Sequence, residues 1–453
     1  MVLTRGKKEV AYVFFLFMFS KVFAYFTLLV FANLYNQEVY GQASFIFAIF
    51  HLVVLFTCMG MPDTLVPWLI KKRDTSSVFY FFLGLNLIVM IVSFVLITQL
   101  RYQWALPFVL LLPFMLLDYF ARAIVKSHYR YDLAQWTSTL YVALTLIFAF
   151  LFRRWEQLGI ALAYSIAYFI PIIFLVWNAR IGLKNVLSRL SIRIQALAQY
   201  LKQGSATMLI TTSFALLTWI DSSILGFLAP FTSVAQYNVA GAIANVVAAI
   251  PLSVMHFILT RSAEVRDVMK ARSILQRSTR LSYVLSMMFG ILINALIFVI
   301  MKIFFPQYQG IEIFVAILSI GVSFYAVYSL FTTYMIGRME QYKTVMPMVL
   351  AAGLNVVLDI LLVPRFGLYG ITVATLFAHA VALMLLTTRL KMYRFFWVLL
   401  LSPLLLLITY ALQWWGLLMV PLSVFVFFLT GLITREDIAI VLQVAQRIAQ
   451  RKA

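Results

Sequence analysis

Charged residues are scarce in this sequence of 453 residues. Asp, Glu, Lys and Arg make up 11% of the chain, against about 25% in a typical soluble protein. Apolar residues make up 64%, which is more apolar surface than a water-soluble fold can bury. Most of the chain must therefore be solvated by lipid, and we expect an all-α polytopic membrane protein.

Cysteine, histidine and acidic residues are also few. The one cysteine, Cys58, excludes an internal disulfide and a thiolate metal cluster. Among 15 acidic residues and 4 histidines, no paired carboxylates, metal-ligand cluster or nucleophile–base pair stands out. The phosphate-binding pattern Gly-x-x-x-x-Gly-Lys-Ser/Thr is missing too. No enzyme activity, no metal and no cofactor are therefore predicted.

Long apolar runs are what the sequence does contain. A membrane-spanning helix needs about 20 mostly apolar residues. Fourteen segments meet this requirement: Val10–Ala32, Tyr40–Met61, Val78–Thr98, Trp104–Ala121, Gln135–Phe152, Leu158–Trp177, Gly204–Leu228, Val234–Leu259, Leu281–Phe304, Ile311–Ile336, Thr344–Val363, Gly367–Thr388, Phe395–Gln413 and Trp415–Ile433. The last two are separated almost only by Trp414, so they form either a hairpin or a re-entrant pair.

The basic residues are unevenly distributed between the loops. With a cytoplasmic N-terminus, 29 of the 35 Lys and Arg residues lie in cytoplasmic segments, 5 lie in outer loops, and Lys21 lies inside a span. This asymmetry predicts a multi-pass protein of the cytoplasmic membrane with both termini in the cytoplasm. It also accounts for the net charge of +20, because basic loops face an anionic leaflet, so a nucleic-acid partner is not expected.

Two basic segments, residues 178–203 and 260–280, have the pattern of amphipathic helices on the cytoplasmic surface. The first of them is the natural linker between two groups of six spans. The predicted units are an N-terminal lobe (1–177), the linker (178–203), a C-terminal lobe (204–390), spans thirteen and fourteen (391–434), and a basic amphipathic cytoplasmic tail (435–453).

An internal repeat supports this division. At an offset of 211 residues, four positions match at the outer loop that enters the last span of each six-span unit. Because six is an even number, the copies have the same orientation, and two such parallel lobes are typical of an alternating-access transporter. The alternative is that outer turns simply favour glycine. The matches are Arg154 with Arg365, Gly159 with Gly370, Ile160 with Ile371, and Ala163 with Ala374.

Several stretches resemble motifs of a known transporter family. They are NVVLDILLVPRFGLYGITVAT from Asn355, DSSILG from Asp221, SVAQYNVA from Ser233 and EVYGQ from Glu38. From about residue 10 to about residue 390 the sequence resembles the polysaccharide-biosynthesis flippases, the Wzx-type branch of the multidrug/oligosaccharidyl-lipid/polysaccharide (MOP) exporter superfamily. One departure is Ala235, where this family usually has glycine.

The resemblance implies a V-shaped, MATE-like fold of two six-helix bundles, often followed by two more helices. It implies that a polyprenyl-(pyro)phosphate-linked oligosaccharide is flipped from the cytoplasmic to the outer leaflet for cell-surface glycan assembly. The drive would be an ion gradient, of H+ or Na+, or removal of product. Expected partners are the lipid-linked oligosaccharide, membrane lipids and the glycan polymerase or glycosyltransferase machinery, with the chain itself a monomer. A MATE-like drug antiporter and a membrane glycan polymerase or ligase are the alternatives.

Ionisable residues inside spans are candidates for a substrate site, because each costs about 2.5–3.5 kcal/mol at a helix centre. Lys21 lies near the middle of the first span and would bind a pyrophosphate head group, or else pair with a buried acid. His51 and His256, in the corresponding spans two and eight, would bind a sugar or carry a proton, or would bond a backbone carbonyl. Arg261 would guide an anionic substrate, or would serve only the charge asymmetry.

Three acids are candidates for binding the coupling ion. Asp118 precedes Arg122 by four residues in span four, so an ion pair on one helix face is the favoured alternative. Asp221 and Asp359 lie in the outer thirds of spans seven and eleven, where helix-end hydrogen bonding is the alternative. His379 in span twelve is expected to be a packing residue.

Prolines inside the spans predict bends, because proline removes a helical hydrogen bond. Pro62 and Pro251 would bend helices that line the cavity between the lobes. Pro107 and Pro113 in span four, and Pro171 in span six, would do the same elsewhere.

Overall fold

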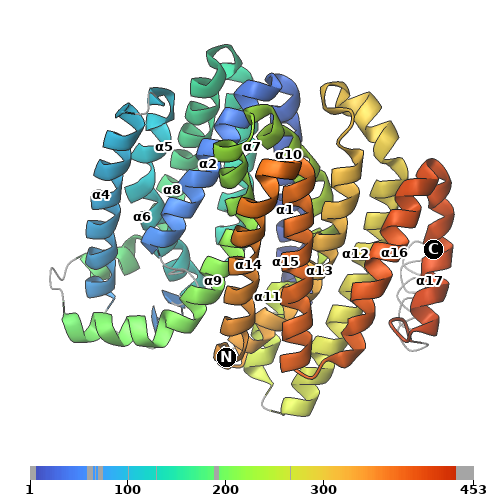
Figure 1. Cartoon of the computed structure of the whole chain (residues 1–453). Coiled ribbons are helices and arrows are strands. Elements are labelled where there is room, and N and C mark those ends of the chain that lie inside the picture. Colours follow the sequence, from blue (N-terminus) through green and yellow to red (C-terminus); the bar gives the residue numbers. More distant parts are fainter. Residues whose placement is uncertain are drawn as a thin grey trace, which may run out of the picture.

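The computed structural model describes residues 7–58, 65–66, 68–69, 75–99, 102–128, 130–187, 193–265 and 267–434. Throughout these ranges the regular structure is helical, with no strand. Figure 1 shows the helices standing side by side, as a membrane-spanning bundle requires. The predicted tail, residues 435–453, and Pro62 lie outside the described residues.

The N-terminal bundle comprises the helices of the first six predicted spans, and the C-terminal bundle comprises those of the next six. The N-terminal bundle contains α1 (Lys7–Leu34), α2 (Gln37–Cys58), α4 (Ser76–Gln99), α5 (Leu106–Leu110), α6 (Leu112–Ser127), α7 (Tyr131–Phe152) and α8 (Glu156–Leu187). The C-terminal bundle contains α9 (Ile194–Leu228), α10 (Phe231–Asn245), α11 (Ala249–Glu264), α12 (Val268–Phe304), α13 (Glu312–Gly337), α14 (Tyr342–Phe366) and α15 (Leu368–Arg389). Two further helices follow, α16 (Phe396–Leu412) and α17 (Met419–Leu429). The exact boundaries between the lobes remain a prediction.

In the described part of the chain, 12 helical stretches are long and apolar enough to cross a membrane. Two of them, 132–180 and 393–429, each cover two of the predicted spans, formed by α7 and α8 and by α16 and α17. The helices therefore match the predicted set of spans, and the fold class is confirmed. With 11 residues, α17 is about 17 Å long and shorter than a hydrocarbon core of about 30 Å, so it needs the preceding short helix Gln413–Leu418 to approach full depth.

The described parts of the two predicted surface segments are almost entirely helical, and they belong to helices that continue into spans, α8 and α9 for the first segment and α11 and α12 for the second. α9 has 35 residues and α12 has 37, so both are about 50–55 Å long and exceed the membrane core. Figure 1 shows the first turns of α9 lying along the lower face of the bundle before the helix turns upward. Asp267 begins α12 as its N-cap, because its side chain accepts hydrogen bonds from the backbone N–H groups of Met269 and Lys270.

Two spans are broken near proline, as predicted. Span four consists of α5 and α6, and Pro113 lies in the first turn of α6. Span eight is broken by a short 3-10 turn, Val246–Ala248, just before Pro251. Pro251 has no N–H to donate to the carbonyl of Val247, and Ser286 Oγ on α12 donates to this carbonyl instead. By contrast, α8 continues through Pro171.

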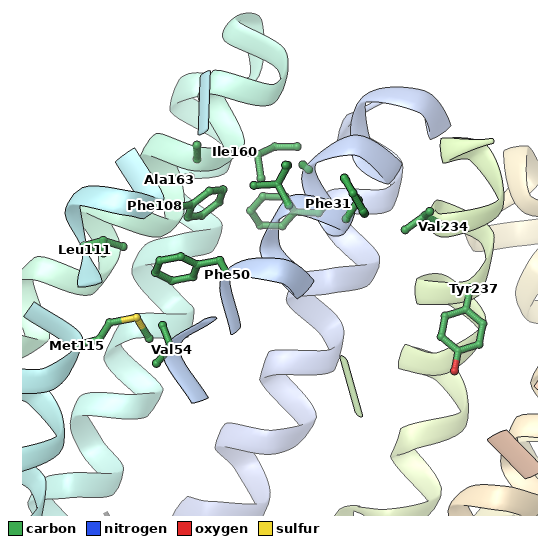
Figure 2. Packing of buried hydrophobic residues seen from close by; sticks show 14 of the residues in the cluster. Phe31, Phe50, Val54, Phe108, Leu111, Met115, Ile160, Ala163, Val234 and Tyr237 are labelled. Carbon is green, nitrogen blue, oxygen red and sulfur yellow. The ribbon is translucent and has the colours of Figure 1, made fainter. Parts of the chain in front are cut away.

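α1 and α2 make most of the contact between the two bundles, and α4 adds a smaller contact with α9. α1 packs against α7 in its own bundle and against α10 and α11 in the other, and α2 packs against α9 and α10. Figure 2 shows Phe50 of α2 near Phe108 of α5, and Tyr237 on α10 across α1 from them. The ring centroids of Phe50 and Phe108 are 5.7 Å apart. One apolar core cluster includes residues of both bundles, so the bundles are closely packed in this state.

Candidate ion and substrate sites

A buried polar cluster in the C-terminal bundle joins four helices. Asp221 of α9, Tyr237 of α10, Asn355 and Asp359 of α14, and Thr375 of α15 meet there. Asp221 is 1% exposed and Asp359 is fully buried. A polar cluster at this depth is costly unless its groups satisfy one another, so its composition is informative.

Asp221 is at the centre of this cluster. Its Oδ1 accepts a hydrogen bond from Asn355 Nδ2 at 2.5 Å, and its Oδ2 lies 2.7 Å from Thr375 Oγ1 and also accepts from the Tyr237 hydroxyl. Asn355 Nδ2 also donates to Asp359 Oδ2 at 3.2 Å, so the amide bridges the two carboxylates. This one amide therefore holds the carboxyl groups of Asp221 and Asp359 in the same cluster.

The cluster has more oxygen atoms than hydrogens to donate. Thr375 has one hydroxyl hydrogen, yet its Oγ1 lies near both Asp221 and the carbonyl of Ile371, 2.8 Å away. Asn355 Oδ1 and Asp359 Oδ1 are buried and have no hydrogen-bond partner in the described structure. Two neighbouring carboxylates of this kind need a shared proton or a bound cation to balance their charge. Carboxylate, amide, hydroxyl and carbonyl oxygens are the ligands that hard cations prefer.

Asp221, Asp359 and Thr375 lie at one depth in their helices. Asp221 is 7 residues before the end of α9, Asp359 is 7 residues before the end of α14, and Thr375 is 7 residues after the start of α15. These ends form what we call the outer end of the bundles, after the predicted orientation. At a rise of about 1.5 Å per residue these three residues lie about 10 Å below it. Asp221 and Asp359 are therefore in the third of α9 and of α14 nearest this end, and that this end faces outward stays a prediction.

Sequence reasoning singled out the two acids but missed Tyr237, Asn355 and Thr375. All three were nevertheless inside the motifs that carry the family resemblance. Asn355 and Asp359 are four residues apart, a spacing that places them on one helix face. Three of the four motifs, those that begin at Asp221, Ser233 and Asn355, meet in this cluster.

The N-terminal bundle has a polar cluster of its own, and it includes a cation. Arg122 Nε donates to Asp118 Oδ2 at 2.7 Å within α6, which is the ion pair expected from the spacing. Arg122 Nη1 donates across to α7, to the carbonyl of Ala134 at 2.7 Å and to Ser138 Oγ at 2.8 Å. The Tyr168 hydroxyl on α8 donates to Asp118 Oδ2 at 3.0 Å. The arrangement ties α6, α7 and α8 together, with its charge balanced internally.

His51 lies at the contact between the bundles. Its ring stacks on Trp219 of α9, with centroids 4.3 Å apart and planes at 28°. Its Nδ1 lies 2.9 Å from the carbonyl of Phe47, which can only accept, so Nδ1 carries a hydrogen. The predicted alternative, a histidine bonded to a backbone carbonyl, is therefore present, in a position that also touches the other bundle.

For three of the remaining predicted residues the structure gives the helix but not the side chain. Lys21 lies within α1, and His256 and Arg261 lie within α11, but their side chains are outside the described residues. The structure therefore does not bring them to either cluster or exclude them from it. His379 is buried between α13 and α15, and its Nδ1 lies 2.8 Å from the Tyr328 hydroxyl, in agreement with a packing role.

Uncharged amides join the two bundles at the outer end. Asn33 Nδ2 donates to the carbonyl of Phe304 at 2.8 Å. Gln307 Nε2 donates to the carbonyl of Ala32, and Gln37 Nε2 donates to the carbonyl of Gln307. A side chain at Gly41 of α2 would collide with the backbone of Phe231 at the start of α10. This outer contact (Asn33, Gln37, Gly41, Phe231 and Gln307) closes the outer end between the bundles.

Comparison with known proteins agrees with this architecture. A structure described as lipid II flippase MurJ in an inward closed conformation is similar with a TM-score of 0.71 and 17% identity, over 96% of this chain and 100% of that one. A MATE structure in a straight conformation has a TM-score of 0.57 and 14% identity, over 85% of this chain and 97% of that one. An inward-facing MATE transporter of the MOP superfamily has a TM-score of 0.54 and 13% identity, over 85% and 94%.

These likenesses establish the fold: a multi-pass membrane protein with the helix arrangement of MOP-superfamily transporters. A search of curated proteins finds no match. The profile of the family described as polysaccharide biosynthesis protein matches residues 7–263, more than half of the chain. This range contains the motifs with Asp221 and Tyr237 and ends before the motif with Asn355, Asp359 and Thr375. The chain therefore belongs to the polysaccharide biosynthesis protein family.

Proposed function

We propose that the protein is a flippase that moves a polyprenyl-(pyro)phosphate-linked oligosaccharide from the cytoplasmic to the outer leaflet, driven by H+ or Na+. Family membership supports a glycan-related substrate. The fold supports alternating access between two bundles, with substrate bound near the midplane. A similar fold in a lipid II flippase, over nearly the whole chain, supports a lipid-linked substrate.

The observation that supports ion coupling is the buried cluster around Asp221 and Asp359. Its two carboxylates and unpartnered oxygens are held in a dry environment by three hydrogen-bonding neighbours. No Lys or Arg is among the described hydrogen-bond partners of either acid. A transported cation would balance the charge, and removing it would leave two acids in low dielectric.

α9 offers a physical route from this cluster to the bundle contact. Trp219 and Asp221 are two residues apart, about 200° around the helix, so they point to opposite sides. Asp221 contacts α14 and α15, whereas Trp219 contacts His51 of α2. A cation that draws α14 and α15 towards Asp221 would therefore shift α9. The shift would also move Trp219, which contacts the N-terminal bundle.

The outer contact defines the conformation. Because amide hydrogen bonds and close backbone packing join the bundles there, a head group would enter this state from the cytoplasmic side. Neutral amides suit a gate that must open repeatedly, since each bond has a net worth of only about 1 kcal/mol. Lys21 and Arg261 are proposed to bind the anionic head group, and His51 and His256 its sugars. The cytoplasmic membrane, with both termini in the cytoplasm, and polymerase or glycosyltransferase partners are part of this proposal.

The test is reconstitution in liposomes with a fluorescent polyprenyl-pyrophosphate-linked oligosaccharide. Leaflet exchange is followed with an impermeant quencher, with Na+ or proton gradients imposed in turn. We expect accelerated exchange that depends on one of the two gradients, and loss of that dependence in Asp221→Asn. The control is Glu340→Gln, which removes a partly exposed acid at the start of α14.

The same liposomes distinguish the alternatives. Efflux of cationic drugs without exchange of the lipid-linked oligosaccharide would identify a MATE-like antiporter and reject the flippase. Exchange that is equally fast without any gradient would retain the flippase and reject ion coupling. Glycan polymerisation by the purified protein would reject transport as the main activity.

A further inference from the structure

A groove lies on the outside of the N-terminal bundle, between the first turns of α7 and the later part of α8. Its volume is about 410 Å³, within the range of small-molecule sites. Trp136 and Phe174 form its walls and are 51% and 50% exposed, so they face the bilayer. Leu133 and Leu140 line it as well. The volume and the mostly apolar lining suit a hydrocarbon chain.

One charge of each sign lies at the mouth of this groove. Arg130 and Asp132 are its charged lining residues, and both are partly exposed. Arg130 Nε donates to Asp132 Oδ1 at 3.4 Å, a long contact that takes one of the five N–H donors of the guanidinium. Exposed ion pairs of this kind are weak, so both groups can exchange partners at little cost.

The wall of the groove on α7 is held rigidly. Ala134 and Ser138 accept hydrogen bonds from Arg122 of α6, on the side of α7 turned into the bundle. Trp136 and Leu140 of the same helix line the groove. A groove wall fixed in this way loses little conformational entropy when a ligand binds.

We propose that this groove binds a zwitterionic aminophospholipid of the phosphatidylethanolamine type. The phosphate would lie beside Arg130, the primary ammonium beside Asp132, and one acyl chain against Leu133, Leu140 and Phe174. The argument is charge complementarity, because adjacent charges of opposite sign match a zwitterion. A purely anionic lipid would place its phosphate near the carboxylate of Asp132. Trp136, near the predicted cytoplasmic interface, has the position usual for an indole at head-group depth.

The test is native mass spectrometry of the full-length protein with phosphatidylethanolamine and phosphatidylglycerol vesicle lipids of matched chains. Wild-type protein should retain one phosphatidylethanolamine preferentially. Asp132→Asn should lower that preference about two- to fivefold, the scale of one exposed ion pair, and shift it toward phosphatidylglycerol. Arg130→Gln should weaken both lipids, and Leu140→Trp, which fills the groove, should displace the bound lipid.

Glu340→Gln serves as the matched control, because Glu340 and Lys343 form a similarly exposed ion pair at the start of α14, away from the groove. Equal melting temperatures in lipid-free detergent would show that the variants fold normally. The proposal is overturned by an unchanged lipid ratio in Asp132→Asn, by retention of the lipid in Leu140→Trp, or by wild-type preference for phosphatidylglycerol. None of these readouts involves transport, so they are independent of the proposed flippase activity.

Discussion

Each bundle buries one polar cluster around an aspartate, and the two clusters balance their charge differently. In the N-terminal bundle, Asp118 accepts hydrogen bonds from Arg122 and Tyr168. In the C-terminal bundle, Asp221 accepts from three neutral side chains and shares the Asn355 amide with a second acid, Asp359. Both clusters join several helices, and in both a tyrosine hydroxyl donates to the central carboxylate.

The difference in charge separates a structural site from one suited to ion transport. A carboxylate paired with its own arginine has no need of a mobile cation, and such a pair mainly holds helices together. Two carboxylates with only neutral donors carry negative charge that no protein group compensates. A transported cation can neutralise this charge when it binds and is released again when it leaves. Of the acid candidates from the sequence, Asp118 therefore fits the first role, and Asp221 and Asp359 fit the second.

The largest expected effect is on the stability of the N-terminal cluster. Arg122→Met would leave Asp118 as an unpaired buried charge, so we expect a loss of about 3–5 kcal/mol in folding stability. The measurement is the melting temperature of purified protein in detergent. Adding Asp118→Asn to Arg122→Met should restore most of the loss. If Arg122→Met instead keeps its stability and loses cation dependence, the roles of the two clusters are reversed.

The next effect concerns transport through the C-terminal cluster. Asp221→Asn keeps the side-chain size but removes the charge on which Asn355 and Thr375 converge. We expect cation-driven leaflet exchange to fall by about tenfold or more, equivalent to about 1.4 kcal/mol. The melting temperature should stay equal or rise, because one of two neighbouring acids is neutralised. A stable Asp221→Asn protein with full cation dependence would move the coupling site elsewhere.

A smaller loss is expected for the second acid. Asp359 accepts a hydrogen bond from Asn355, whereas Asp221 accepts from side chains of three helices. Asp359→Asn should therefore raise the cation concentration for half-maximal exchange by about three- to tenfold, with the maximal rate largely kept. An effect larger than that of Asp221→Asn would make Asp359 the principal ligand.

The sequence was sufficient to predict the architecture, because lipid solvation restricts the chain to helices and the apolar runs reveal them. It also identified Asp118 with Arg122, since an i,i+4 pair is a local property of one helix. It placed Asp221 and Asp359 at similar depths by counting residues from the helix ends.

The tertiary partners could not be predicted in the same way. Whether Thr375 reaches Asp221 depends on how α15 is rotated against α9, and a helix that is apolar on most sides gives little periodic signal for rotation. The contact of His51 with Trp219 likewise depends on how two bundles dock. The amides Gln37 and Gln307 were missed because neutral side chains in short outer loops have no distinctive pattern.

The smallest effects are expected for the two tyrosines, and they provide a matched test of the comparison. Tyr168→Phe removes a donor to Asp118, whose charge remains paired with Arg122. It should cost about 1 kcal/mol in stability and leave the cation dependence unchanged. Tyr237→Phe removes a donor to Asp221 and so disfavours the ionised carboxylate, which is the form that binds a cation. The cation concentration for half-maximal exchange should rise about two- to fivefold. Equal effects of the two variants on cation dependence would show that both clusters belong to one coupled site. A tyrosine that only supports a structural ion pair should not change how the cation binds.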